Sequence, residues 1–101
     1  MTVGATRTPW EGPPPKPEEL EQLLAEQGMV PRWWGNAPGD VYGWHSHGYH
    51  KVLYCAEGSI TFHTKDGDLE LYPGDRLDVP PDVAHAATVG PRGCRCIEAA
   101  R

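Results

Sequence analysis

Two histidines separated by a single residue, His45 and His47, are the feature that most constrains how this chain folds. Because successive side chains on a β-strand point to opposite faces, both imidazoles project to one side and come close enough to share an ion. A third ligand is expected from His85, which follows a run rich in proline and glycine at residues 73–82. Imidazole nitrogen suits several transition metals, and three protein ligands leave positions open for water or substrate. The pattern is typical of a catalytic rather than a sealed structural metal site.

The spacing around these histidines resembles the two motifs of the cupin family. The first motif is matched by Gly39, five residues, His45-Ser46-His47 and, further on, Gly58, and the second by Gly74, five residues, Pro80 and then His85. The resemblance covers about residues 38–98. It implies an all-β fold, a cupin-type double-stranded β-helix or jelly-roll barrel, with a metal pocket inside.

The chain departs from the family pattern at three positions. Lys51 stands where cupins usually carry a glutamate ligand, Asp82 replaces the glycine of the second motif, and Val89 replaces its closing asparagine. The lysine matters most, because a dication and an ammonium about 5 Å apart repel by several kcal/mol even at an effective dielectric of about 20. Either Lys51 is neutral, or its long stem carries the amine away from the metal, or an anionic ligand lies between them.

The length of 101 residues is that of one domain with a modest core, and the 12 glycines and 11 prolines fit many tight turns between short strands. We divide the chain into a flexible, proline-rich arm at residues 1–16, a short amphipathic helix at 17–28 and a barrel at 29–101. The helix begins at Pro17, carries two glutamates in its first turn and stops at Gly28. Its leucines are expected to cover the outside of the barrel.

Strands are expected at short, regular spacing along the rest of the chain, with a hairpin turn at Asp66-Gly67 and a similar turn at Glu57-Gly58. Their predicted ranges are 30–34, 41–47, 51–56, 59–65, 68–71, 76–79, 84–89 and 94–99. The thiols of Cys55, Cys94 and Cys96 are expected to be reduced, since two cysteines two apart on one strand are poorly placed for a bridge.

The net charge of −5 argues against nucleic acid or an anionic membrane as the partner. No apolar run approaches a membrane span of about 18–20 residues, so a cytoplasmic protein is expected. Trp10 in the proline-rich arm either anchors the arm to the barrel or to a neighbouring subunit, or belongs to a disordered tail. The arm, together with the edge strands that a small barrel must cover, favours a homodimer.

Strand alternation places Tyr49, Lys51 and Cys55 on the same inner face as His45 and His47. Val83, Ala87 and Val89 are expected inside as well, while His63 is expected to be an exposed strand residue and His50 to lie outside, unless a bulge brings it in as a fourth ligand. The predicted cavity has apolar walls and a few convergent polar groups, which is the usual composition of a small-molecule site.

Two functions remain open. The first is a metal-dependent oxygenase or isomerase for a small anionic or phenolic molecule, with His45, His47 and His85 as metal ligands and with Lys51 and Tyr49 as catalytic residues. The metal is a divalent transition ion, with zinc, iron, nickel, manganese and copper all open. The second is a binding or sensing barrel without turnover, which includes the case of a barrel that has lost its metal and uses the histidines for hydrogen bonds.

Overall fold

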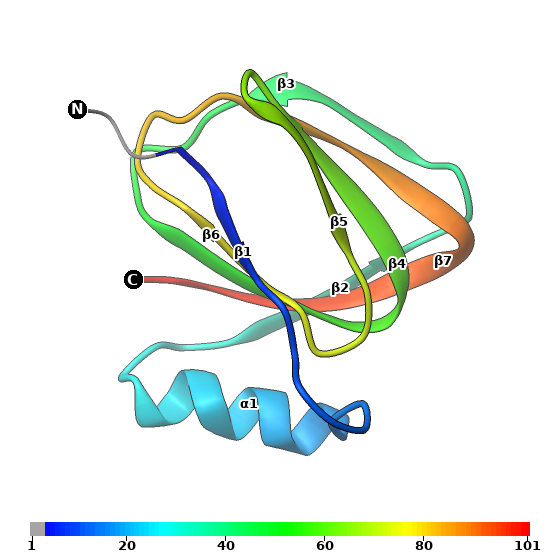
Figure 1. Ribbon diagram of the computed structural model, residues 1–101. Helices are drawn as coiled ribbons and strands as arrows, with labels where there is room; N and C mark the ends of the chain where they lie inside the picture. Colours follow the sequence, from blue (N-terminus) through cyan, green and yellow to red (C-terminus); the bar gives the residue numbers. More distant parts are fainter. Residues whose placement is uncertain (1–3) are drawn as a thin grey trace.

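The computed structural model describes residues 4–101, which form one short helix and a set of antiparallel strands curved into a barrel (Figure 1). The elements in chain order are β1 (Thr6–Thr8), α1 (Pro17–Glu26), β2 (Arg32–Asn36), β3 (Val41–His45), β4 (Lys51–Thr64), β5 (Gly67–Leu71), β6 (Arg76–Val79) and β7 (His85–Ala100). The predicted all-β fold with one N-terminal helix is confirmed.

Two long strands, β4 and β7, organise the barrel. They pair antiparallel from Lys51↔Ala100 to Thr64↔His85, and both bend along their length (Figure 1). β6 pairs with the first part of β4 and β5 with its second part, while β3 and β2 pair with the first and second parts of β7. The ladder between β4 and β7 therefore contributes to both sides of the barrel.

The structure corrects the prediction of a turn at Glu57-Gly58. Strand β4 runs through both residues, with register shifts between Cys55 and Glu57 and between Gly58 and Ile60. Gly58 has a φ of 71°, and a Cβ built there would lie 2.0 Å from the carbonyl oxygen of Gly93. Glycine at this position permits a bend within β4, where the sequence predicts a hairpin. The two strands predicted at 51–56 and 59–65 are therefore a single strand. The strands predicted at 84–89 and 94–99 likewise form the single strand β7, whereas the hairpin between β4 and β5 at Asp66-Gly67 is confirmed.

Alternation along β4 divides its side chains between two cores. Leu53, Cys55, Ile60 and Phe62 lie in the barrel interior with Val89 and other inward residues of β6 and β7, which confirms the predicted inward positions of Cys55 and Val89. In the first part of the strand, Val52, Tyr54 and Ala56 face outward and are covered by the helix.

Helix α1 packs its apolar side against the outer face of β4 and β7, as predicted (Figure 1). Leu20 and Leu24 are fully buried against Val52 and Ile97. Burial of a leucine side chain contributes about 1.5–3 kcal/mol to the free energy of unfolding. The helix therefore stabilises the barrel wall from the outside, and it does not line the cavity. Among the described residues, no helix is both long and apolar enough to cross a membrane.

The proline-rich arm lies against the barrel over the part that the structure describes, whereas the sequence predicts a flexible segment. Thr6–Thr8 form β1, which pairs antiparallel with β6. The backbone N–H of Trp10 donates to Asp75 Oδ1 at 2.9 Å, and its indole N–H donates to the carbonyl of Pro13 at 2.8 Å. The pairing of β1 with β6 and the bond from Trp10 to Asp75 therefore hold the described part of the arm against its own barrel, while the indole bond stays within the arm. Residues 1–3 lie outside the described part.

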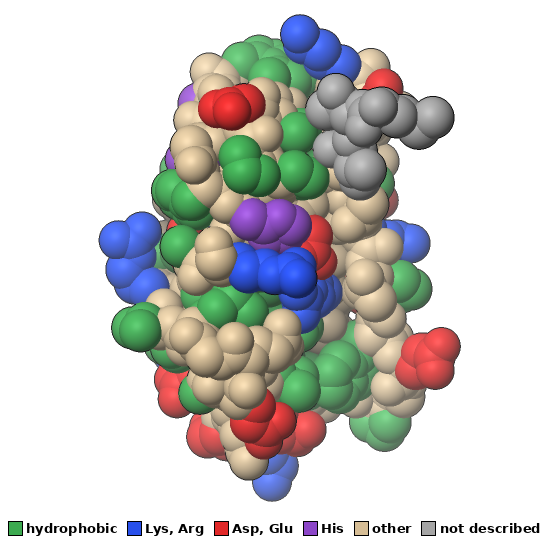
Figure 2. All heavy atoms as spheres, turned by 90° about the vertical axis from the view of Figure 1, so that its left-hand side faces the viewer, with side chains coloured by type: hydrophobic (Ala, Val, Ile, Leu, Met, Phe, Trp, Pro, Cys, Tyr) green, Lys and Arg blue, Asp and Glu red, His purple; other side chains and the backbone are tan. Residues whose placement is uncertain are grey.

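The surface carries charges of both signs. On the face shown in Figure 2, basic side chains are scattered among acidic and hydrophobic ones. The described residues of this face therefore present no continuous basic stripe of the kind that binds a phosphate backbone.

Candidate metal centre and cavity

Three imidazoles meet at one end of the barrel interior. His45 ends β3, His85 begins β7, and the two residues are partners in the ladder between these strands. His47 follows in the loop after β3, because the strand ends two residues earlier than the sequence predicts. One ligating atom from each ring lies within 4.8 Å of the others, and the ring centroids are 4.3–5.2 Å apart. The predicted trio is thus brought together in a form that can hold a metal ion.

Hydrogen bonds to the main chain fix which nitrogens face the cluster. Nδ1 of His45 lies 2.7 Å from the carbonyl of Gly43, and Nδ1 of His85 lies 2.9 Å from the carbonyl of Val83. A carbonyl only accepts, so both Nδ1 atoms carry the proton and both Nε2 atoms keep a free lone pair. Metal-binding histidines typically use one nitrogen on the metal and the other on such a partner.

Two of these nitrogens are buried without any partner. Nε2 of His47 and Nε2 of His85 are inaccessible and make no hydrogen bond within the described chain. A buried polar atom without a partner costs free energy, and a shared ion would remove that cost at both atoms.

The local electrostatics keep two of the rings neutral. Burial, followed by the charge of Lys51, lowers the pKa of His47. Burial lowers the pKa of His85 as well, against the opposing effect of its hydrogen bond to Val83. Neutral imidazole is the form that binds metals, so both side chains are ready to bind at neutral pH.

The other two histidines have carboxylate partners and lie apart from the cluster. Nδ1 of His63 lies 2.8 Å from Asp68 Oδ1, and its Nε2 lies 2.8 Å from the Thr88 hydroxyl. His63 lies on β4, as predicted, but it is only partly exposed, and it stands outside the group of three histidines.

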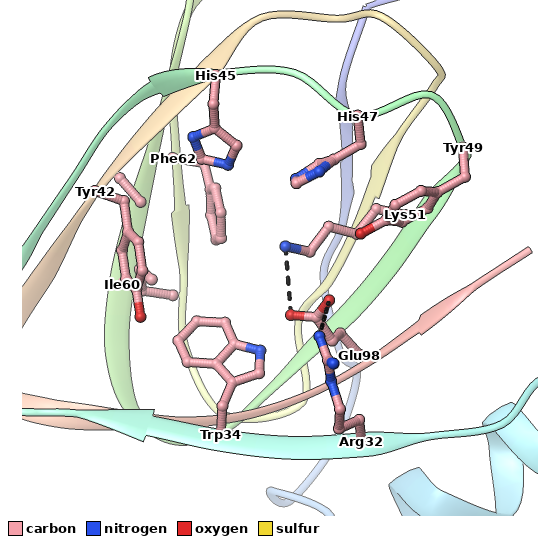
Figure 3. A pocket seen from close by; sticks show the side chains of 11 residues that line it. Arg32, Trp34, Tyr42, His45, His47, Tyr49, Lys51, Ile60, Phe62 and Glu98 are labelled. Atoms are coloured by element: carbon pink, nitrogen blue, oxygen red, sulfur yellow. Dashed lines mark ion pairs between the residues drawn. The ribbon is translucent and has the colours of Figure 1, made fainter.

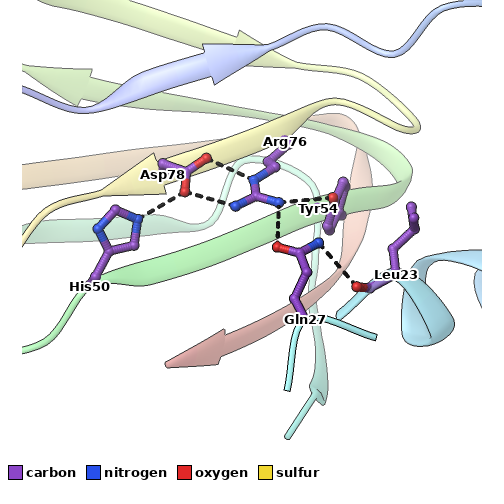
Figure 4. A network of polar contacts seen from close by, with 6 residues as sticks. All are labelled: Leu23, Gln27, His50, Tyr54, Arg76 and Asp78. Carbon is purple, nitrogen blue, oxygen red and sulfur yellow. Dashed lines mark hydrogen bonds and ion pairs between the residues drawn. The ribbon is translucent and has the colours of Figure 1, made fainter. Parts of the chain in front are cut away.

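His50 belongs to a separate polar network on the outside of the barrel (Figure 4). Its Nε2 lies 2.8 Å from Asp78 Oδ1, and the same carboxylate accepts two hydrogen bonds from Arg76. Burial raises the pKa of Asp78, but the hydrogen bonds from Arg76 and His50 outweigh it and lower the pKa overall. Arg76 also donates to Gln27, which follows α1, so this network ties the helix to the barrel.

A cavity of about 340 Å³ opens beside the imidazoles (Figure 3). Its wall combines apolar and aromatic side chains with a few charged groups, as the sequence predicts. The lining residues are Arg32, Trp34, Tyr42, His45, His47, Tyr49, Lys51, Ile60, Phe62, Ala87 and Glu98.

Lys51 points into this cavity and has an ionic partner that the sequence analysis does not identify. Its Nζ lies 3.3 Å from Oε1 of Glu98, and Arg32 approaches the other carboxylate oxygen at 3.8 Å (Figure 3). Lys51 and Glu98 are both buried. The carboxylate balances the lysine charge close to the imidazoles. In the sequence, Glu98 follows Cys94 and Cys96 at intervals of two residues, which places the three side chains on the same face of a strand. The pairing of β7 with β4 is what brings Glu98 to Lys51.

Tyr49 lines the mouth of the cavity, where its ring stacks on that of His47 with centroids 5.0 Å apart. It remains partly exposed. The three cysteines are free and buried in the core, and none of them lines the cavity.

Comparison with known proteins supports this assignment of the fold. The chain is 41% identical over 49 residues to quercetin 2,3-dioxygenase of Bacillus subtilis, a match that covers 48% of this chain but only 14% of that enzyme. Among solved structures, an RmlC-like cupin from Shewanella frigidimarina superposes with a TM-score of 0.64 at 26% identity, covering 71% of this chain and 64% of the other. The polyketide cyclase RemF of Streptomyces resistomycificus superposes with a TM-score of 0.64 at 25% identity, covering 71% of this chain and 53% of the cyclase.

The chain also matches the family model described as the AraC-like ligand binding domain over residues 35–97. That range holds both motifs, all three clustered histidines and most of the cavity wall. The chain has the cupin fold and belongs to the AraC-like ligand-binding domain family.

Proposed function

We propose that this protein holds one divalent transition metal at His45, His47 and His85 and presents it to a small organic molecule in the adjacent cavity. The observation that carries the proposal is the pair of buried Nε2 atoms, on His47 and His85, that have no partner within the described chain. Three imidazole nitrogen donors suit zinc, iron, nickel or copper, and manganese remains open.

The bound molecule is proposed to be aromatic or unsaturated and to carry an oxygen anion or a phenolic hydroxyl. Ile60, Phe62 and Ala87 supply the apolar wall, and the three charges of Arg32, Lys51 and Glu98 leave a net positive charge on the wall. A bound metal would act as a Lewis acid toward a ligand oxygen.

Lys51 and Tyr49 are the proposed catalytic residues of the chain itself. The Lys51 ammonium is held in the cavity by Glu98, from where it can orient an anionic group or give it a proton. The Tyr49 ring, stacked on His47, limits access of water from the mouth of the cavity. The local similarity to a dioxygenase favours oxygenation of a phenolic compound as the reaction.

An assay on metal-loaded protein tests this function. Protein loaded in turn with iron, nickel, manganese, copper and zinc is mixed with flavonols, phenols and small aromatic acids, and oxygen uptake and ligand binding are measured. Turnover with at least one redox-active metal, lost in His85→Ala and retained in His63→Ala, is the expected result. Binding without turnover for every metal would favour the second candidate, a non-catalytic ligand-binding barrel, to which the family description points. Absence of both binding and turnover would contradict the proposal.

We also propose that two copies of the chain associate. Within the described residues β3 pairs only with β7, and its Val41 and Trp44 side chains are exposed by 71% and 59%. An open strand edge beside exposed apolar side chains favours pairing with another chain. Light scattering should give a dimer for the natural protein and a monomer for Trp44→Lys; a natural protein that stays monomeric at high concentration would rule the association out.

A further inference from the structure

The cavity has a second polar end that the metal site does not use. In Figure 3, His45 and His47 lie at one end, Trp34, Arg32 and Glu98 lie at the other, and the Lys51 amine lies between them. A ligand that reaches from the imidazoles across the cavity therefore meets polar groups at both of its ends.

The Lys51–Glu98 pair can still both donate and accept hydrogen bonds. The ammonium has three N–H donors, and the ionised carboxylate has about four lone-pair sites. The contacts at 3.3 Å to Lys51 and 3.8 Å to Arg32 use only part of this capacity. A group that faces the pair is recognised best if it too can both donate and accept.

Trp34 adds a donor without a partner. Its indole N–H is buried and makes no hydrogen bond within the described chain, although the ring lines the cavity. Figure 3 shows the indole nitrogen on the side of the ring that faces Lys51 and Glu98. An indole N–H only donates, so an oxygen that arrived here would relieve a buried unsatisfied group.

The apolar wall lies between these two polar ends. Ile60 and Phe62 line the cavity from β4, and Ala87 lines it from β7. A flat apolar body fits this wall, and a hydroxyl group is the smallest group that can donate to Glu98 while it accepts from Lys51 or Trp34. A second carboxylate in the same place could accept from Lys51 or Trp34 but has no proton to donate to Glu98, so it would leave two carboxylates facing each other.

Resting on the proposed function, we propose that Trp34, Lys51 and Glu98 form a hydroxyl-recognition subsite. The subsite selects aromatic ligands that carry a hydroxyl group at the end remote from the oxygen that faces the histidines. It discriminates against the same ring without a hydroxyl and against the same ring with a second carboxylate.

Calorimetry on zinc-loaded protein tests the subsite with four probes that share one ring: benzoate, 3-hydroxybenzoate, 4-hydroxybenzoate and benzene-1,4-dicarboxylate. Zinc avoids turnover, and the zinc content of each sample is measured first. At least one hydroxybenzoate should bind about tenfold more tightly than benzoate, because its hydroxyl bonds to charged groups, and the dicarboxylate should bind more weakly than either hydroxybenzoate. Equal affinities for benzoate and both hydroxybenzoates, or no binding of any probe by zinc-loaded protein, would overturn the subsite and leave the metal site standing.

Two substitutions test whether Trp34 and Glu98 cause the preference for a hydroxybenzoate over benzoate. Trp34→Phe keeps an aromatic ring without the N–H, and Glu98→Gln removes the charged acceptor; each should reduce the preference for the hydroxybenzoate to less than about threefold, while His63→Ala should retain it. A preference unchanged in both variants would overturn the assignment. If natural protein bound no zinc, the proposed metal function would fail independently of the subsite. The same four titrations on zinc-free protein would then test the subsite, by the ratio of each hydroxybenzoate affinity to the benzoate affinity.

Discussion

The ammonium of Lys51 lies 3.3 Å from a carboxylate oxygen of Glu98, and both side chains are buried beside the three clustered histidines. A buried charge is tolerated when it is paired, and removal of one member leaves the other uncompensated. This relationship explains how a lysine can occupy the position where related barrels carry a glutamate.

The first prediction concerns the stability of this pair. Glu98→Leu leaves the Lys51 ammonium buried without its nearest anion and should lower the free energy of unfolding by about 3 kcal/mol. The double variant Lys51→Met/Glu98→Leu should recover most of that loss, because no buried charge remains unpaired. Urea denaturation of the natural protein, Glu98→Leu, Lys51→Met and the double variant measures the coupling. A double variant as unstable as the sum of the two single variants would show that the two residues act independently.

The second prediction concerns Lys51 and the metal. Lys51→Glu places a carboxylate ligand near the imidazoles and removes a positive charge, so affinity for a divalent metal should rise by about tenfold or more. The metal-free variant should be less stable than the natural protein, since the new carboxylate lies beside Glu98. Lys51→Met is the control that removes the charge without adding a ligand. A metal affinity that does not change in Lys51→Glu, measured by competition with a chelator, would mean that this side chain does not influence the site.

Much of this arrangement followed from local pattern in the sequence. Strand alternation placed Lys51, Leu53 and Cys55 inside, and helical periodicity placed Leu20 and Leu24 on the outer wall. These patterns depend only on neighbours close in the chain. The spacing of the second motif predicted His85 as the third member of the histidine group.

What the sequence missed depends on contacts between distant segments. Glu98 reaches Lys51 because β7 pairs with β4, and the arm lies on the barrel through the pairing of β1 with β6 and the bond from Trp10 to Asp75. The pair Glu57-Gly58 predicts a turn from local sequence alone, but a glycine with a positive φ serves a bulge as well as a hairpin. The close approach of the Gly93 carbonyl, which the sequence does not show, accompanies the bulge.

The third prediction tests that bulge. Gly58→Ala combines a φ of 71° with a Cβ that would lie 2.0 Å from the Gly93 carbonyl oxygen, so it should destabilise the protein by at least about 2 kcal/mol. Gly43→Ala is a matched control on β3, where a Cβ would meet nothing within 4 Å. Thermal denaturation should show a clear fall in Tm for the first variant and little change for the second. Equal Tm values for the two variants would contradict the close packing of Gly58 on Gly93.

The fourth prediction concerns the pH dependence of the metal-free protein. The pKa values of His47 and His85 are lowered from 6.5, mainly by burial, so near and below pH 6.5 the unfolded chain binds more protons than the folded chain. Stability should therefore fall as pH decreases from about 6.5 through the lowered pKa values. Denaturation midpoints between pH 7.5 and 5 measure the effect, and the variant His47→Gln/His85→Gln should show a smaller slope. An equal slope in the two proteins would mean that other groups control this range.

The metal content of purified protein tests the central claim most directly. We predict that the natural protein, reconstituted with zinc or nickel and freed of excess metal, retains one ion per chain by elemental analysis. His45→Ala, His47→Ala and His85→Ala should each weaken binding by about tenfold or more. The control His63→Ala, whose ring nitrogens already bond to Asp68 and Thr88, should retain the full amount. A natural protein that holds no metal, or three single variants that all keep a full complement, would contradict the account.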